Sequence, residues 1–215
     1  MRVFLTTIVF SVSATLFAQT PVVKGVVTYF FNEYQGDKPD LGAKVYLIEK
    51  KDASFINKKV IDSFLDGKFY RRLYFDYVRF ATTYEEIMKR YEGKKKYKTE
   101  YDEAKKKYDD VVKERDEHFD RMKLFGSETK EKFDSLDLRV ATMISMIGDK
   151  NSSVLTVDAT GGYSFNVKSG NYFVYIVSRN RKSLSASEVV GKIFLKEIEV
   201  KDNQTIDVST NFDLY

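Results

Sequence analysis

Residues 156–172 have the sequence TVDATGGYSFNVKSGNY, and this stretch decides the fold. Asp158 can accept hydrogen bonds from its own backbone at a turn, and one of the two glycines that follow can supply a positive φ. Tyr163 and Phe165 then alternate with polar residues, which is the period of a half-buried strand. Gly170 marks the next turn. The stretch therefore predicts two strands joined by a short turn.

Strand patterns continue on both sides of this stretch. After it, apolar residues alternate in three further runs: Tyr172, Val174 and Ile176; Ile193, Leu195, Ile198 and Val200; Ile206 and Val208. Far upstream, residues 21–51 show the same alternation, around a turn at residues 34–40. Short strands at this spacing are typical of a β-sandwich. Two strands alone cannot bury a useful apolar face, so we expect residues 19–52 and 149–215 to form one discontinuous domain.

The segment between these parts, residues 53–148, is predicted to be helical. It contains no proline, and its apolar residues recur at a three-four spacing, for example at Tyr97, Tyr101, Ala104, Tyr108 and Val111. Both ends of the segment belong to one domain, so the helices must run out and come back. We expect a helical hairpin or a small bundle, which a short linker could replace without loss of the β domain.

Three glycines are predicted to divide this helical segment. Gly67 and Gly93 are possible breaks, because glycine is unfavourable inside a helix by roughly 1 kcal/mol relative to alanine. Gly126 is the clearest break, with Ser127 as the N-cap of the next helix and Glu128 in its first turn. That last helix is predicted to stop at Gly148.

The two flanks, joined across the insertion, resemble the carboxypeptidase regulatory-like domain, a transthyretin-like β-sandwich. The similarity lies in residues 24–29 (KGVVTY), 39–47 (PDLGAKVYL) and 156–172. It covers less than half of the chain and departs from the family by the helical insertion, where a short connection is usual. The resemblance implies an accessory domain of exported proteins, for binding or spacing, without chemistry of its own.

The fold class that we predict is α+β: a transthyretin-like or Ig-like antiparallel β-sandwich with an inserted α-helical hairpin or small bundle. Residues 1–18 are predicted to be a signal peptide, because Arg2 precedes an apolar run that is too short to span a bilayer. Ala18 is the predicted cleavage position. The chain has no cysteine, which excludes a lipoprotein anchor after the signal. We therefore predict a secreted, periplasmic or cell-surface protein.

Charge and composition indicate no nucleic-acid partner. The formal net charge is only +4. The basic clusters at residues 94–98 and 105–107 include aromatic neighbours, but Asp102, Glu103, Asp109 and Asp110 are interspersed with them. A solvated helix face explains such a pattern better than a nucleic-acid surface.

No catalytic arrangement is visible in the sequence. His118 is the only histidine, and we expect it to pack on a charged helix rather than act as a base or ligand. Zinc sites need several histidine or cysteine ligands. Asp158 lacks the repeated Asp or Asn of a calcium loop. We therefore predict no enzyme, no metal and no cofactor, with a hydrolase that uses a carboxylate pair as the weaker alternative.

The segment Phe69–Phe80 has the strongest signal of an interaction surface. It carries more aromatic surface than one buried stripe needs, and aromatic residues and arginine are enriched at interfaces. The predicted partner-binding residues are Tyr70, Arg71, Tyr74 and Tyr77. In the alternative, this helix is wedged between the sandwich and the other helices, and the same residues serve packing.

We therefore predict an exported, non-catalytic binding or scaffolding protein of the envelope or cell surface, whose specificity is carried by the helical insertion. Its partner would be another envelope or extracellular protein. The alternative is a carbohydrate-binding module that uses exposed tyrosines to bind a glycan.

Overall fold

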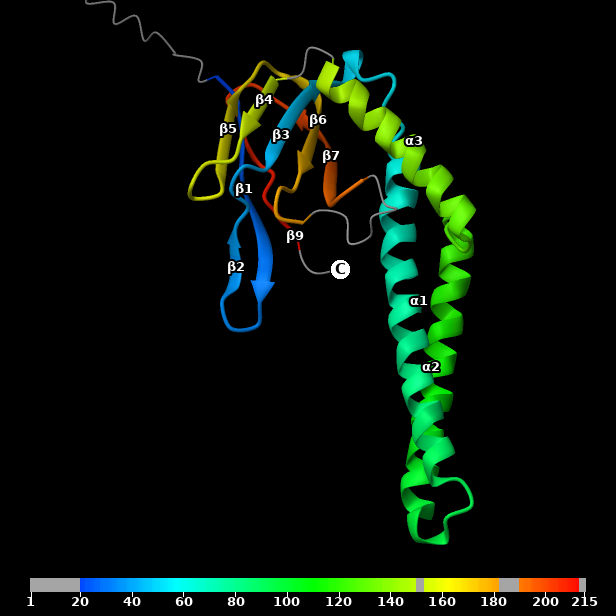
Figure 1. The fold of residues 1–215 in the computed structure, drawn as a ribbon. Helices are drawn as coiled ribbons and strands as arrows, with labels where there is room; N and C mark the ends of the chain where they lie inside the picture. The colour runs from blue at the N-terminus through cyan, green and yellow to red at the C-terminus, as the bar shows by residue number, and fades with distance from the viewer. Residues whose placement is uncertain (1–19, 150–152, 182–189, 213–215) are drawn as a thin grey trace, which may run out of the picture.

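The computed structural model describes residues 20–149, 153–181 and 190–212. The predicted signal peptide, residues 1–18, and its cleavage position lie outside the described residues. Within the described ranges the fold is α+β, with two antiparallel-rich sheets and three helices (Figure 1). The strands are β1 (Val22–Asn32), β2 (Gly36–Pro39), β3 (Lys44–Glu49), β4 (Ser153–Thr156), β5 (Gly162–Asn166), β6 (Gly170–Val177), β7 (Ile193–Val200), β8 (Thr205–Asp207) and β9 (Thr210–Phe212). The helices are α1 (Lys58–Tyr91), α2 (Lys98–Leu124) and α3 (Lys130–Asp149), with short 3-10 turns at Lys50–Asp52 and Lys95–Tyr97.

Both sheets combine strands from the two sides of the helical segment. In the first sheet, β1 pairs antiparallel with β5 along its first half and with β2 along its second half. The same strand pairs in parallel with β8 and β9. The second sheet is antiparallel throughout and has the order β4-β3-β6-β7. Residues before α1 and residues after α3 therefore share every sheet.

One hydrophobic core lies between the two sheets. It contains the alternating residues that the sequence indicated, including Val45 of β3, Val174 of β6 and Phe165 of β5. The hydroxyl group of the buried Tyr163 donates a hydrogen bond of 2.6 Å to the carbonyl oxygen of Val208. These contacts account for the short strands as the two layers of a sandwich.

The turn before β5 forms as the sequence predicts. The Oδ1 atom of Asp158 accepts hydrogen bonds from the backbone N–H and the hydroxyl of Thr160 and from the backbone N–H of Gly162. The hydroxyl of Thr160 and these backbone N–H groups lower the pKa of the Asp158 carboxyl below its usual value. Gly161 takes the positive φ, at 84°.

A second hydrophobic core lies on the opposite face of the β4-β3-β6-β7 sheet. Phe173 and Tyr175 of β6 pack there against Ile61 of α1 and Val140 of α3. Strand β6 is thus buried on both faces, which explains its unbroken apolar run. The base of the helical segment therefore covers the sheet, in contrast to the expectation that a short linker could replace it.

The helix ends differ from the predicted ones at Gly67 and Ser127. Gly67 lies buried inside α1 and does not break it; a Cβ there would come within 2.9 Å of the Ser127 Oγ atom. Ser127 is buried, and its hydroxyl donates toward the carbonyl oxygens of Gly67 and Met122 instead of capping a helix. Thr129 holds the N-cap position of α3, because its Oγ1 accepts from the Lys132 N–H at 3.3 Å. The prediction of Ser127 as the N-cap was wrong.

Candidate interaction surface on the helical hairpin

Helices α1 and α2 form an antiparallel hairpin that projects away from the sandwich, while α3 runs back to it (Figure 1). Helix α1 has 34 residues, and at 1.5 Å per residue it is about 50 Å long. Only its first turns contribute to the core on the sheet, through Ile61 and Phe64. In Figure 1 the farther part of α1 lies beside α2 alone, and the chain reverses between them at Gly93, whose φ is 71°.

The three predicted binding tyrosines lie at the seam between α1 and α2. The ring of Tyr70 stacks on Phe125, with centroids 5.7 Å apart. Tyr74 packs on Phe119 at 5.5 Å, and Tyr77 packs on His118 at 5.0 Å. All three tyrosines are half-buried. The structure thus packs the three rings against α2 and the residue after it and leaves each ring partly exposed. Their role in partner binding stays a prediction.

Arg71 holds the corner between α2 and α3. Its Nη1 atom donates a hydrogen bond of 3.0 Å to the carbonyl oxygen of Ser127. Its guanidinium carbon lies 5.2 Å from the ring centroid of Phe75 and 5.1 Å from that of Phe133. A guanidinium over aromatic rings is a favourable arrangement. The side chain therefore contributes to the structure of the corner.

The exposed aromatic residues of the same segment are others, which the sequence reasoning missed. Phe69, Phe75 and Phe80 have exposed fractions of 43%, 44% and 53%, and Phe75 has the guanidinium of Arg71 over its ring. Eleven residues of α-helix make just over three whole turns, so the rings of Phe69 and Phe80 lie on the same side of α1, about 16 Å apart along its axis. Tyr70 and Tyr77 pack toward α2, and the two exposed rings border them, with Phe69 5.2 Å from Tyr70 and Phe80 6.0 Å from Tyr77 between ring centroids. We call Phe69 and Phe80 the aromatic face. The 11-residue spacing was the signal in the sequence that could have separated it from the seam.

The lone histidine belongs to the hairpin packing. His118 is half-buried, and its ring lies near those of Tyr70 and Tyr77, at centroid distances of 6.1 and 5.0 Å. Within the described ranges, no three His, Cys, Asp or Glu side chains gather closely enough to hold a metal ion. The arrangement suits packing between the two helices.

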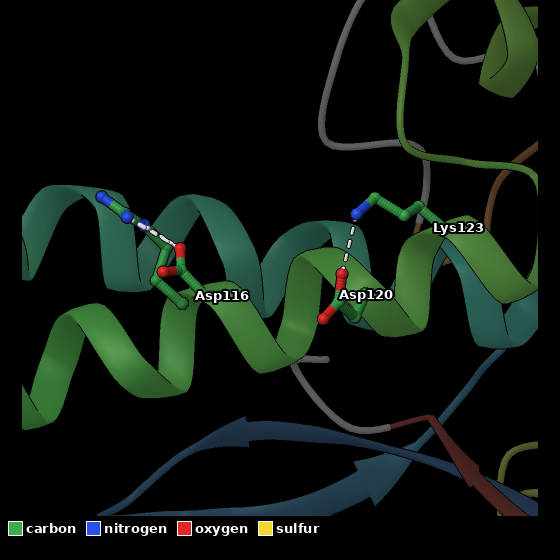
Figure 2. Close-up of polar contacts among 4 residues, drawn as sticks. Asp116, Asp120 and Lys123 are labelled. Carbon is green, nitrogen blue, oxygen red and sulfur yellow. Dashed lines mark hydrogen bonds and ion pairs between the residues drawn. The ribbon is translucent and has the colours of Figure 1, made fainter.

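The carboxylates along α2 are exposed and paired locally. Figure 2 shows Asp116, Asp120 and Lys123 along this helix. Oδ1 of Asp116 accepts from the guanidinium of Arg115 at 2.7 Å, and Oδ1 of Asp120 pairs with Nζ of Lys123 at 2.8 Å. Exposed ion pairs of neighbouring residues contribute little to stability. Both carboxylates are exposed to solvent and lack the buried surroundings typical of a catalytic general acid.

A buried carboxylate occurs elsewhere, at the end of the sandwich. Asp40 is completely buried. Its Oδ1 accepts from the backbone N–H and the side-chain amide of Asn180, at 3.1 and 2.6 Å, and its Oδ2 accepts from the hydroxyl of Ser178. These bonds tie the segment before β3 to the segment after β6. The Asp40 side chain therefore connects two loops, and the turn formers around it were the signal for this position in the sequence.

Comparison with known proteins does not show a family for this chain. The sequence matches no family model and no curated protein. Among solved structures, the pilus backbone protein RrgB of Streptococcus pneumoniae is similar at 12% identity and a TM-score of 0.25, over 88% of this chain and 39% of that one. This chain thus spans about two fifths of the length of the pilus protein. A similarity this low carries no argument about fold or function. In the described part of the chain, the helices are too short or too polar to cross a membrane.

Proposed function

We propose that this chain is an exported, non-catalytic binding or scaffolding protein, in which the sandwich is the platform and the helical hairpin is the binding element. The observation that carries the proposal is the projection of the hairpin. Its outer part packs on itself, so both of its sides are available to a partner (Figure 1). The sandwich residues, by contrast, are accounted for by turns and cores.

The aromatic face is the proposed contact with a protein partner. Phenylalanine side chains that remain exposed on a helix offer apolar area to a second surface. Between the two rings lies Asp76, which pairs with Arg79 at 3.3 Å and lies 4.0 Å from Arg72. A patch of apolar rings with charges beside them has the composition of a protein-binding site.

Site-specific photo-crosslinking in the native envelope tests this proposal. A photoreactive phenylalanine analogue at position 69 or 80 should give a discrete adduct of higher mass. The same analogue at Leu138 should give none, because Leu138 is an exposed apolar residue of α3, far along the chain from the aromatic face. The double variant Phe69→Ser and Phe80→Ser should lose the partner and keep its helical circular dichroism. Equal adducts at all three positions would defeat the proposal.

We further propose that the sandwich is a carboxypeptidase regulatory-like domain. Support comes from residues 156–172, which form the turn and the core strands that this family's pattern requires. Such a domain supplies spacing and binding, in agreement with the platform role. An experimental structure superposed on members of that family would decide this relationship by strand order.

A glycan-binding role is the second candidate, and one observation favours it. Tyr34, at the turn between β1 and β2, has an exposed fraction of 97%. Phe31 is exposed nearby, with the Nζ atom of Lys38 3.8 Å from its ring centroid. Exposed aromatic rings can stack on sugars. A glycan array with the wild-type chain and Tyr34→Ala tests this role: binding that disappears in the variant would support it.

A further inference from the structure

The end of the hairpin farthest from the sandwich carries a dense positive charge. Residues 89–98, with the sequence KRYEGKKKYK, contain six cationic side chains and one carboxylate, although the whole chain has a formal charge of only +4. All seven charged side chains are exposed. Lys89 pairs with Glu85 at 2.9 Å, and the other cations of this segment pair with no carboxylate of the described chain. We call residues 89–98 the basic tip.

The basic tip is a projecting end with a compact structure. The rings of Tyr91 and Tyr97 stack across the reversal, with centroids 5.1 Å apart. Gly93 takes the positive φ of 71° that turns the chain, and no other group lies within 4 Å of the place where its Cβ would be. The stacked rings hold together the reversal that carries the cations at the end of the hairpin.

We propose that the basic tip binds the surface of a membrane rich in anionic phospholipids. Five of the six cations are lysines, which act as point charges and lack the planar fork with which arginine recognises single phosphate groups. Such cations suit a diffuse field of headgroups. Tyrosines are the side chains that favour the headgroup level of a bilayer. The projecting end of a hairpin is better suited to contact a flat membrane surface than to bind a flexible acidic polymer. Such a polymer would be bound along a groove or an extended line of cations.

This inference goes beyond the proposed protein partner, because it concerns a separate part of the hairpin. Lysine near an anionic membrane surface contributes enough to strengthen binding about fivefold per side chain. Removal of three lysines should then weaken binding about a hundredfold. The attraction falls off within a Debye length, which is about 8 Å at physiological ionic strength. Position along the hairpin therefore decides which lysines contribute.

The chain offers a charge-matched control for this test. Lys105, Lys106 and Lys107 are exposed on α2, and they lie about 10 to 14 Å farther along the helix axis than Lys98. The variant Lys94→Gln, Lys95→Gln, Lys96→Gln and the variant Lys105→Gln, Lys106→Gln, Lys107→Gln lose the same charge. Both keep exposed polar side chains, so both should keep the fold, which circular dichroism checks.

The experiment measures co-sedimentation of the chain from Gln19 onward with vesicles. Wild type should bind vesicles of phosphatidylcholine with 30% phosphatidylglycerol, should ignore pure phosphatidylcholine, and should dissociate at high salt. The triple variant at residues 94–96 should bind the vesicles about a hundredfold more weakly than wild type. The triple variant at residues 105–107 should lose only a small factor in affinity for the vesicles. Equal losses in the two variants, or no binding by wild type, would overturn the proposal. Tighter binding to soluble polyglutamate than to the anionic vesicles would also overturn it, in favour of an acidic polymer.

Fluorescence gives an independent readout of which part touches the lipid. The chain has no tryptophan, so Tyr97→Trp places a single indole at the basic tip. Its emission should shift to shorter wavelength with anionic vesicles, whereas Tyr34→Trp at the β1–β2 turn should give no shift. A shift at the turn without one at the tip refutes tip-first contact. The variant of the aromatic face should retain vesicle binding, so failure of the proposed protein contact and failure of the lipid contact are distinguishable.

Discussion

Excision of the helical segment is expected to unfold the sandwich. Replacement of residues 53–148 by a short Gly/Ser linker would uncover the outer face of the β4-β3-β6-β7 sheet. The uncovered side chains include Ile48, Phe173, Tyr175, Ile193 and Leu195, all of which are buried in the second core. Burial of one such side chain stabilises a protein by roughly 2 kcal/mol, so the loss is about 10 kcal/mol. That is comparable to the whole stability of a typical domain, about 5–15 kcal/mol.

A shorter deletion is the matched control. The contact between Tyr77 and His118 sets the register of the hairpin, and by the same register Ala81 lies near Glu114. Removal of residues 82–113, with a four-residue Gly/Ser turn in their place, leaves α3 and the base of α1 on the sheet. The entropy of closing a loop depends only weakly on the length of the loop. The shortened chain should therefore fold.

Size-exclusion chromatography, circular dichroism and thermal unfolding distinguish the two deletions. The shortened hairpin should be monomeric, with a cooperative unfolding transition. The full excision should aggregate or lack such a transition. If the full excision gives a monomeric β protein with cooperative unfolding, the sheet needs no cover from the helices, and the second core is dispensable.

Three further changes test individual residues. Tyr74→Ala should destabilise the hairpin by about 1–3 kcal/mol, because it removes ring packing at the seam. Thermal unfolding followed by circular dichroism at 222 nm measures this loss, and unchanged stability would return Tyr74 to the candidate binding surface. Tyr175→Phe should leave the free energy of unfolding equal or up to about 1 kcal/mol higher in urea titrations, because the buried hydroxyl of Tyr175 has no hydrogen-bond partner in the described chain. A marked decrease in that free energy would reveal such a partner. The pKa of Asp158 is lowered by the Thr160 hydroxyl and by backbone N–H groups. The ionised carboxylate therefore stabilises the fold at pH values above its pKa in the unfolded chain, near 3.9, and this stabilisation is lost as the pH falls through the lower pKa of the folded state. Asp158→Ala should accordingly lose less stability than wild type on acidification across that window, and parallel pH profiles would contradict this.

Alternation predicted the strands well because each face of a sheet imposes a period of two. Tyr163, Phe165 and Val174 face the core between the sheets, as that period requires. The pattern could not show what covers the other face. In β6, Phe173 and Tyr175 fill the alternate positions, so the run from Tyr172 to Val177 is apolar without a break. Such a run predicts burial on both faces, and it was the available sign that a helix packs there.

Helix existence was predictable, but the direction of each side chain was not. The apolar spacing of residues 97–111 indicated one stripe, which the hairpin buries. In α1 several neighbouring aromatic residues could each face α2. Composition alone therefore cannot assign Tyr70 to the seam and Phe69 to the solvent. That assignment depends on the rotation of α1 about its axis. The rotation is set by the close approach at Gly67, where the Ser127 hydroxyl and the helix backbone meet.

The two parts of α1 are therefore under different physical demands. Its first turns must be apolar toward the sheet, because β6 presents Phe173 and Tyr175 to them. Its outer turns need only a seam with α2, which small and aromatic residues such as Ala81 and Tyr77 provide. The fold thus leaves the outer surface of the hairpin unconstrained by the sandwich. The rings of Phe69 and Phe80 remain about half exposed, although each contacts a tyrosine of the seam. The cations of the basic tip other than Lys89 pair with no carboxylate of the described chain. The proposed contacts with a protein partner and with an anionic membrane surface would give each of these groups a physical role.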